Sequence, residues 1–331
     1  MLEPEYKEAL KLGQKEYKAC VSKGEDPYLP ALDEILAARD IAGEQDLGTI
    51  QVPINLIVGT KTAGRANSFA RNFMPIASET SEFAVKWERL CQSHLEEGIR
   101  DPVKAYEYMN RFYVEEGNKR VSVLRYFDAV SVTARVVRLL PEKDGSKESE
   151  LYYEFVNFYQ ISKINFLEFS KPGGYVKIQE LLGKEPGELW SQEDRRSFAG
   201  AYYIFQNAYY SAGGKNLSST VGDALLAYLE VYGYPSLRGK STQELKKEIS
   251  KVWEEITLQQ EEAPIDVKLD PSEKKQGLIS KVLLVDESKT IRAAYVHDSS
   301  PEQSGWTEGH ERGREYIERV MNGQVKTSPY Y

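Results

Sequence analysis

The sequence predicts a mixed α/β (α+β) protein, in which a small sheet-containing domain precedes a helical region. Three observations carry this prediction. Strand-like apolar segments alternate with amphipathic helical segments up to Pro141. Residues 151–260 have a mostly helical pattern and are rich in tyrosine. Residues 290–323 have a strand, a loop and a helix closed by Gly323, like the first unit of a further α/β domain.

The composition excludes several classes of function. The 331 residues suffice for two domains and part of a third. A net charge of −8 and a sequence pI of about 5.3 argue against a broad basic face for nucleic acid. The two cysteines give no disulfide framework, and three scattered histidines give no metal-ligand spacing. We therefore expect a reducing, cytoplasmic setting and no metal site.

We recognise no targeting signal in the N-terminal segment. It lacks a basic region followed by an apolar one, and no apolar run precedes Cys20 as a lipobox requires. No stretch approaches the roughly 18 apolar residues of a membrane span. These features also predict a cytoplasmic protein that does not insert into a membrane.

The elements before residue 66 end in a glycine-rich loop. A helix is predicted from Pro4 to about Ser22, a second over 31–42, and a strand over 51–59. The loop over 59–66 has the glycine spacing of a P-loop, but Arg65-Ala66 stands where lysine and a hydroxyl residue belong. We expect a loop that carries Lys61 and Arg65 towards a ligand.

The remaining elements of the first domain follow in a regular order. A helix is expected over 81–97 because Phe83, Trp87 and Leu90 form an apolar stripe. Strands over 101–107 and 111–115, a helix over 120–128 and a strand over 132–140 complete the domain.

The most informative segment is the junction between the strand at 111–115 and the helix that follows it. A helix start exposes unpaired backbone N–H groups and the positive end of the helix dipole. Gly117 lets the backbone approach a ligand, and Lys119 and Arg120 add full charges beside it. Together with Asn118, they predict an anion site, most simply for a phosphate.

The helical region contains one pattern that leaves two interpretations open. Helices are expected over 201–210, 221–232 and 241–256, and Ser241 and Glu244 have the spacing of a capping box. The last two helices form either a packed pair or a helix-turn-helix, although their connector is longer than usual. The acidic charge balance makes DNA binding the less favoured interpretation. Residues 261–275 are polar and predict a linker.

Residues 51–141 resemble the ParB/sulfiredoxin-like superfamily. The resemblance lies in a strand, the sequence Gly117-Asn118-Lys119-Arg120, a helix and a closing strand, with Gly98–Val103 as the preceding strand pattern. It implies a nucleotide, with Mg²⁺, bound through Gly117, Lys119 and Arg120. Asn118 occupies the position of the reactive cysteine of sulfiredoxins, which excludes their chemistry, and Ser122 stands where the CTP-using ParB proteins have an arginine.

Residues 292–331 are similar to the opening of BMP-family (PnrA-like) substrate-binding proteins of ABC transporters. The matching residues are Trp306-Thr307, His310, Gly313 and Arg314. The resemblance implies a truncated periplasmic-binding-protein-like domain, of which these residues form the first strand-helix unit. It also implies that Trp306 stacks on a nucleoside base. A hydrophobic anchor at a helix start is the alternative role of Trp306.

These interpretations divide the chain into five parts. They are N-terminal helices (1–45), a ParB/sulfiredoxin-like domain (46–145), a helical domain (146–262), a linker (263–289) and the start of a BMP/PnrA-like domain (290–331).

The sequence favours a cytoplasmic, ligand-responsive regulatory protein that binds a nucleotide or phosphate and senses a nucleoside. Two alternatives stay open: a nucleoside-binding component of an ABC transporter, and a ParB-like NTPase, kinase or DNA-binding protein. Phosphoryl transfer would need a metal-binding acid near the anion site. Glu115, Glu116 and Asp128 are the candidates, and the sequence favours a binding protein over an enzyme without deciding between them.

Overall fold

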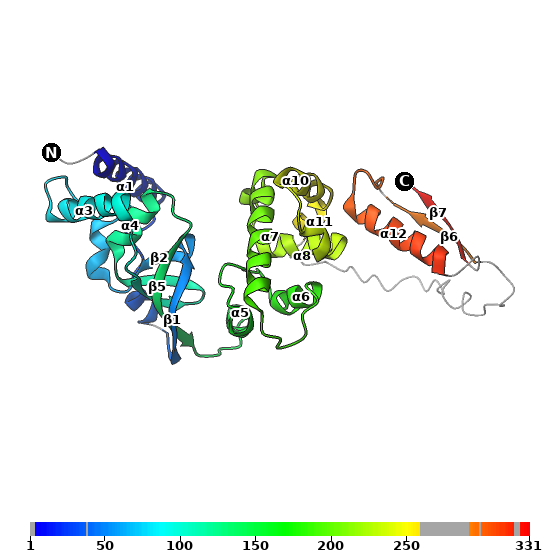
Figure 1. Cartoon of the computed structure of the whole chain (residues 1–331), viewed down its shortest axis with the longest axis horizontal. Helices are drawn as coiled ribbons and strands as arrows, with labels where there is room; N and C mark the ends of the chain where they lie inside the picture. Colours follow the sequence, from blue (N-terminus) through cyan, green and yellow to red (C-terminus); the bar gives the residue numbers. More distant parts are fainter. Residues whose placement is uncertain (1–3, 38, 259–290, 298, 321–324) are drawn as a thin grey trace, which may run out of the picture. The chain divides into compact units, whose positions relative to one another are not determined.

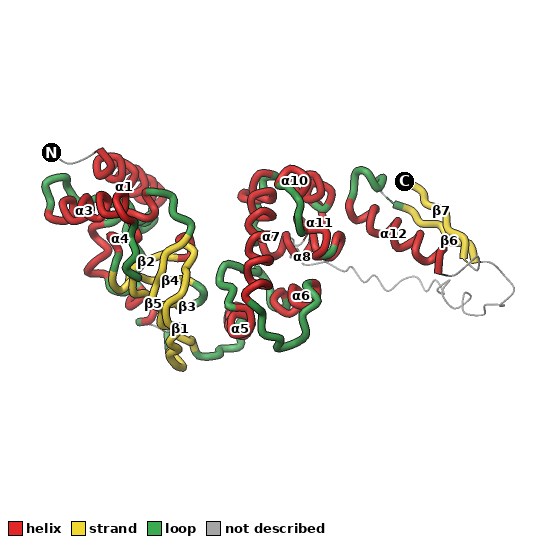
Figure 2. The backbone as a smooth tube through the Cα atoms, viewed as in Figure 1, coloured by secondary structure: helices red, strands yellow, loops and turns green. Residues whose placement is uncertain are grey.

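The chain divides into two compact units, Met1–Tyr153 and Glu154–Tyr331. The first contains a five-stranded sheet with helices, and the second is helical before a small strand-helix-strand segment (Figures 1 and 2). This computed structural model confirms the predicted mixed α/β class. The predicted linker at 263–289 lies outside the described residues, which are 4–37, 39–258, 291–297, 299–320 and 325–331.

The sheet of the first unit is mixed, with strand order β1-β5-β3-β4-β2. The edge strand β1 pairs antiparallel with β5, β5 runs parallel to β3, β3 pairs antiparallel with β4, and β4 runs parallel to β2. The tight turn between β3 and β4 places Met109 and Asn110 at positive φ. The strands are β1 (Ile41–Pro53), β2 (Ile57–Thr60), β3 (Val103–Tyr108), β4 (Arg111–Glu116) and β5 (Ser131–Pro141).

The two faces of this sheet are covered by different helices. Side chains alternate along a strand, so Phe112 and Val114 of β4 reach one buried cluster and Tyr113 reaches another. The first cluster includes residues of α4 (Asn118–Tyr126), whereas the second includes Leu32 of α2 (Leu32–Leu36). A third cluster joins α4 to α1 (Pro4–Lys23) and α3 (Glu82–Glu97), which Figure 1 shows together.

Helix α4 is held to its surroundings along its whole length. At its start, the Nδ2 group of Asn118 donates to Thr60 Oγ1 at 3.2 Å. In its middle, Trp87 Nε1 donates to Ser122 Oγ at 2.9 Å. Near its end, the half-buried guanidinium of Arg125 donates to the carbonyl oxygens of Ile54 (2.8 Å) and Ile57 (2.5 Å). These contacts fix the first turn of α4 relative to the sheet.

The prediction for the segment between the first helix and the glycine-rich loop is wrong in two places. The helix expected over 31–42 shrinks to the five residues of α2, and the strand β1 begins at Ile41. The strand expected over 51–59 is interrupted by the 3₁₀ turn η1 (Ile54–Leu56). Residues 41–52 are polar and glycine-containing, so their conformation is decided by pairing with β5 more than by local preference.

The core around Trp87 leads to an expectation at alkaline pH. Tyr6 and Tyr126 pack edge-on against Trp87 with ring centroids 5.5 and 5.7 Å away. Burial raises the pKa of both phenols to about 12. The folded unit therefore holds these protons more tightly than the unfolded chain, in which tyrosine titrates near pH 10.

We expect the contribution of these two phenols to the stability of the first unit to be constant up to about pH 10 and to fall as the pH rises towards 12. Urea unfolding followed by the fluorescence of Trp87 in a Trp190→Phe, Trp253→Phe, Trp306→Phe background measures it. The Tyr126→Phe variant serves as the comparison, since it removes one phenol, and its stability should fall less steeply over this range. An equal slope for both proteins contradicts the expectation.

The second unit begins as an aromatic-rich helical array, which confirms the helical pattern predicted for 151–260. Phe158 and Phe198 both pack edge-on against Trp190, with ring centroids within 5.6 Å. The predicted capping box at Ser241 and Glu244 is present. The helices are α5 (Lys147–Ser162), α6 (Gly174–Leu181), α7 (Gln192–Ser211), α8 (Val221–Tyr232), α9 (Tyr234–Leu237), α10 (Thr242–Lys251) and α11 (Trp253–Leu258), with the 3₁₀ turn η3 (Gly214–Asn216).

The last segment is a parallel strand-helix-strand unit. Strand β6 (Ile291–Val296) leads into α12 (Gly305–Val320), and β7 (Val325–Tyr330) returns parallel to β6. The sequence predicts β6 and α12 but not β7, which is polar and contains Pro329. A proline is tolerated in a strand that has a partner on one side only. The structure thus adds a second strand to the predicted strand-helix unit.

Candidate functional site

The start of α4 requires glycine. Gly117 has φ +109°, a conformation that other residues rarely adopt, and a Cβ there would lie 2.7 Å from Val103 Cγ1. Glycine provides no side chain to cap the helix, and the amide of Val121 donates to Gly117 O at 3.0 Å. The first turn of α4 thus has the polarity that favours an anion.

This first turn lines a pocket of about 500 Å³. The predicted residues Gly117, Asn118, Lys119 and Arg120 all contribute to the lining. The remaining walls come from the segment after β2 and from α3, and their lining residues are Gly64, Ser68, Phe69, Phe83 and Leu90. The pocket therefore combines a cationic helix start with an aromatic and aliphatic wall.

The two cations of the pocket are held differently. The Nζ atom of Lys119 lies 4.6 Å from the centroid of the Phe83 ring, in a cation–π contact. The guanidinium of Arg120 donates from Nη1 to Pro102 O at 2.8 Å, and its Nη2 lies 3.5 Å from Glu116 Oε1. Arg120 thus fixes the chain before β3 to the start of α4 as well as lining the pocket.

Asn118 connects the pocket to the sheet beneath it. Its Nδ2 group donates to Thr60 Oγ1, and the Thr60 hydroxyl donates to Val114 O at 3.0 Å. Both residues are buried, with Asn118 6% exposed and Thr60 fully covered. The sequence analysis assigned no role to Thr60 and gave Phe83 only a packing role in the apolar stripe of the helix at 81–97. The one sequence feature that could have identified Thr60 is its place in the glycine-rich loop at 59–66.

Of the two predicted cations of the glycine-rich loop, the structure describes the side chain of Lys61, which lies outside the lining of this pocket. Lys61 Nζ lies 3.0 Å from Asp33 Oδ1 and 5.1 Å from the ring centroid of Tyr106. The hydrogen bond to Asp33 raises the pKa of Lys61. Lys61 therefore does not line the pocket at the start of α4. Arg65 lies in the 3₁₀ turn η2 (Ala63–Ser68), and its side chain is outside the described part of the structure.

Among the candidate acids, Glu116 has structural partners. Glu116 pairs with Lys104 at 2.8 Å as well as with Arg120. Asp128 follows the end of α4 and adopts a positive φ of 53°. Within the residues that the structure describes, no group of three or more His, Cys, Asp or Glu side chains is placed to hold a metal ion.

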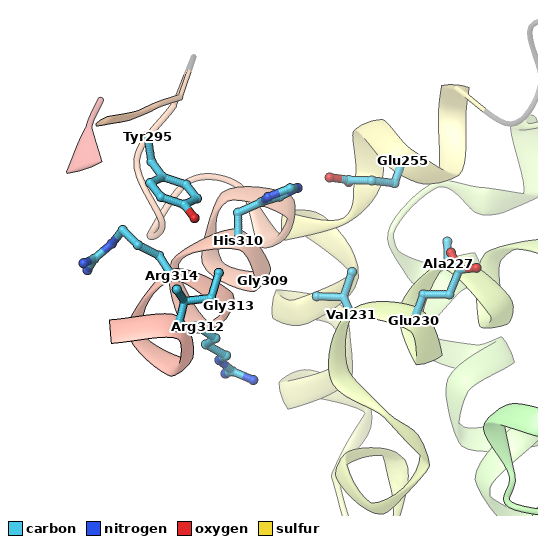
Figure 3. Close-up of a pocket in the computed structure, with 11 residues that line it drawn as sticks. Ala227, Glu230, Val231, Glu255, Tyr295, Gly309, His310, Arg312, Gly313 and Arg314 are labelled. Atoms are coloured by element: carbon cyan, nitrogen blue, oxygen red, sulfur yellow. The ribbon is translucent and has the colours of Figure 1, made fainter. Parts of the chain in front are cut away.

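A second pocket, of about 650 Å³, lies in the second unit (Figure 3). Tyr295 and α12 form one side, and α8 and α11 form the other. Its arginines are engaged elsewhere, because Arg312 pairs with Glu308 at 2.8 Å and Arg314 pairs with Glu311 at 2.7 Å. This pocket is therefore a weaker candidate for an anion-binding site than the pocket at the start of α4.

Trp306, the predicted nucleoside-stacking residue, lies in the first turn of α12. The position matches the predicted loop-helix junction after β6, but the Trp306 side chain is outside the described part. The sequence-based role of Trp306 therefore stays a prediction.

Comparison with known proteins adds no assignment to this geometry. No protein-family model matches the chain, and no curated protein matches it. None of the helices in the described ranges combines the length and the apolar character that a membrane span needs. The candidate role of the start of α4 therefore depends on the geometry and charge of its pocket alone.

Proposed function

We propose that the first unit is a ParB/sulfiredoxin-like domain that binds a nucleotide through its phosphate at the start of α4. One observation carries the proposal: Lys119, the start of α4 and the Phe83 wall line the same pocket. A phosphate is stabilised by the amides and dipole of a helix start, and an adjacent ammonium adds a full charge. An aromatic wall suits the ring of a base.

Size and connectivity also support this proposal. Pockets for small molecules usually measure about 300 to 1,000 Å³, and this one lies within that range. The order β4, Gly117, α4 and β5 follows the superfamily pattern of strand, glycine with basic residues, helix and closing strand. Mg²⁺ would be held mainly by the phosphates of the ligand.

We further propose that the chain is a ligand-responsive regulatory protein whose last segment belongs to a nucleoside-sensing BMP/PnrA-like module. The observation that favours this second role is the parallel β6-α12-β7 connection. Ligands of such open α/β arrangements bind beyond the carboxyl ends of the strands. Trp306 follows β6 on that side, at the beginning of α12.

Calorimetric titration of the full chain tests the first role. We expect a nucleoside triphosphate with Mg²⁺ to bind at low salt, and Lys119→Met to weaken its affinity by tenfold or more because a charge-assisted contact is lost. Lys11→Met, on the exposed side of α1, removes the same charge outside the lining and should leave the affinity within about twofold.

The titration has two outcomes that contradict the proposal. One is the absence of binding at millimolar concentrations of nucleoside triphosphates and inorganic phosphate. The other is an equal effect of Lys119→Met and Lys11→Met, which would place the bound ligand away from α4.

A further inference from the structure

We propose that Asn118 determines specificity at the start of α4, because its Oδ1 accepts a hydrogen bond from a hydroxyl group of the ligand. This inference rests on the proposed function and adds the chemical class of the ligand. The site would select a phosphorylated sugar, such as the ribose phosphate of a nucleotide, over inorganic polyphosphate.

The orientation of the Asn118 amide follows from its hydrogen bonds. The Thr60 hydroxyl has a single proton, which it donates to Val114 O at 3.0 Å. Thr60 Oγ1 can therefore only accept from Asn118, and the group that lies 3.2 Å from it is Nδ2. Turning the amide over would bring Oδ1 against the lone pairs of Thr60 Oγ1. The network thus fixes Oδ1 on the other side of the amide.

Oδ1 of Asn118 is buried and has no hydrogen-bond partner among the described residues. A buried polar atom without a partner is unfavourable, and such atoms are uncommon in folded proteins. Asn118 is also one of the residues that line the pocket, although the whole residue is only 6% exposed. The first residue of α4 therefore carries a hydrogen-bond acceptor without a partner, at a helix start that favours anions.

An acceptor in an anion site has a definite chemical consequence. The oxygens of a fully ionised phosphate only accept hydrogen bonds, so they cannot satisfy Oδ1 and are repelled by it. A hydroxyl on the carbon skeleton of the same ligand can donate to Oδ1 while the phosphate lies at the amides of α4. Because Oδ1 is closed to solvent, the ligand must displace a neighbouring side chain to reach it.

The test compares two ligand classes on two proteins by calorimetric titration of the full chain. Ribose 5-phosphate carries donors, whereas tripolyphosphate at alkaline pH carries none. Asn118→Leu keeps the branched shape of the side chain and the backbone amide but removes both polar atoms, Oδ1 and Nδ2. We expect the variant to bind ribose 5-phosphate about tenfold more weakly and tripolyphosphate with an affinity that is equal or higher. Asn157→Leu, the same substitution at an exposed position of α5 outside the lining, should change neither affinity by more than about twofold.

A second measurement uses the unaltered protein, in case Asn118→Leu does not fold. Ribose 5-phosphate should bind about tenfold more tightly than its tri-O-methyl derivative, which keeps the phosphate and loses the donors. Equal affinity for these two ligands overturns the role of Asn118, as does an equal loss of both ligand classes in Asn118→Leu. In those cases the phosphate still binds and the proposed function stands. Failure of every phosphate-bearing ligand to bind overturns both.

Discussion

Replacing Arg138 with methionine is expected to lower the free energy of unfolding of the first unit by about 3 to 5 kcal/mol. Arg138 of β5 and Glu107 of β3 form an ion pair in which both residues are almost fully buried. Glu107 also accepts from the amide of Asn110 at 2.6 Å and from the Tyr152 hydroxyl at 3.1 Å. Removing the guanidinium would leave a buried carboxylate without its counter-charge.

The protonation of Glu107 limits how much of this loss is observed. Burial raises the pKa of Glu107, while the charge of Arg138 and the hydrogen bonds from Arg138, Asn110 and Tyr152 oppose that rise. Without Arg138, the carboxyl group should bind a proton more readily in the folded unit than in the unfolded chain. The variant should therefore recover stability as the pH falls towards the ordinary pKa of glutamate, near 4.3.

Urea unfolding followed by Trp87 fluorescence measures this effect, because Trp87 is the sole tryptophan in residues 1–153. Fluorescence of the other tryptophans is removed by the same phenylalanine substitutions as above. Lys86→Met, which breaks an exposed pair with Glu82, is the matched control and should cost no more than about 1 kcal/mol. The double variant Glu107→Gln, Arg138→Met should recover most of the lost stability, since both charges leave the interior together and the glutamine oxygen can still accept from Asn110 and Tyr152.

Two results would contradict this account of the buried pair. Arg138→Met could prove no more destabilising than Lys86→Met, which would mean that water reaches the carboxylate. The double variant could also prove as unstable as the single one, which would make shape more important than charge at this position.

The features that the sequence predicts best are those set by neighbouring residues. The junction of β4 and α4 is recognisable because an apolar strand, a glycine and a helical stripe follow one another directly. The capping box of α10 is equally local, because Ser241 and Glu244 are three residues apart. For the candidate site, the same local reasoning groups residues 117–120, and these four residues line one pocket in the structure.

The features that the sequence does not reveal depend on partners far along the chain. Strand β1 is stabilised by β5, about 90 residues later, and its own residues do not have a strong strand preference. The contact of Asn118 with Thr60 spans 58 positions. The sequence also does not predict that the Lys61 side chain contacts Asp33, because this contact depends on how α2 packs beside β2.

Gly117→Ala is expected to remove ligand binding at α4 and to lower the free energy of unfolding of the first unit by about 2 to 4 kcal/mol. Two costs add together in this variant. A residue with a Cβ is strained at φ +109°, and the new methyl group would lie 2.7 Å from Val103 Cγ1. Relief of both costs requires the first turn of α4 to shift away from β3, which would misplace its amides.

Two comparisons separate these causes. Gly64→Ala alters another glycine of the same pocket lining, but no atom lies within 4 Å of the added methyl group, so stability should stay within about 0.5 kcal/mol. Gly117→Ala combined with Val103→Ala removes the contact and keeps the backbone strain. If the pair restored stability without restoring phosphate binding, the position of the first turn itself would be the requirement for binding. If Gly117→Ala bound phosphate as tightly as the unaltered protein, the anion site would lie elsewhere, because no shifted turn could present the same amides.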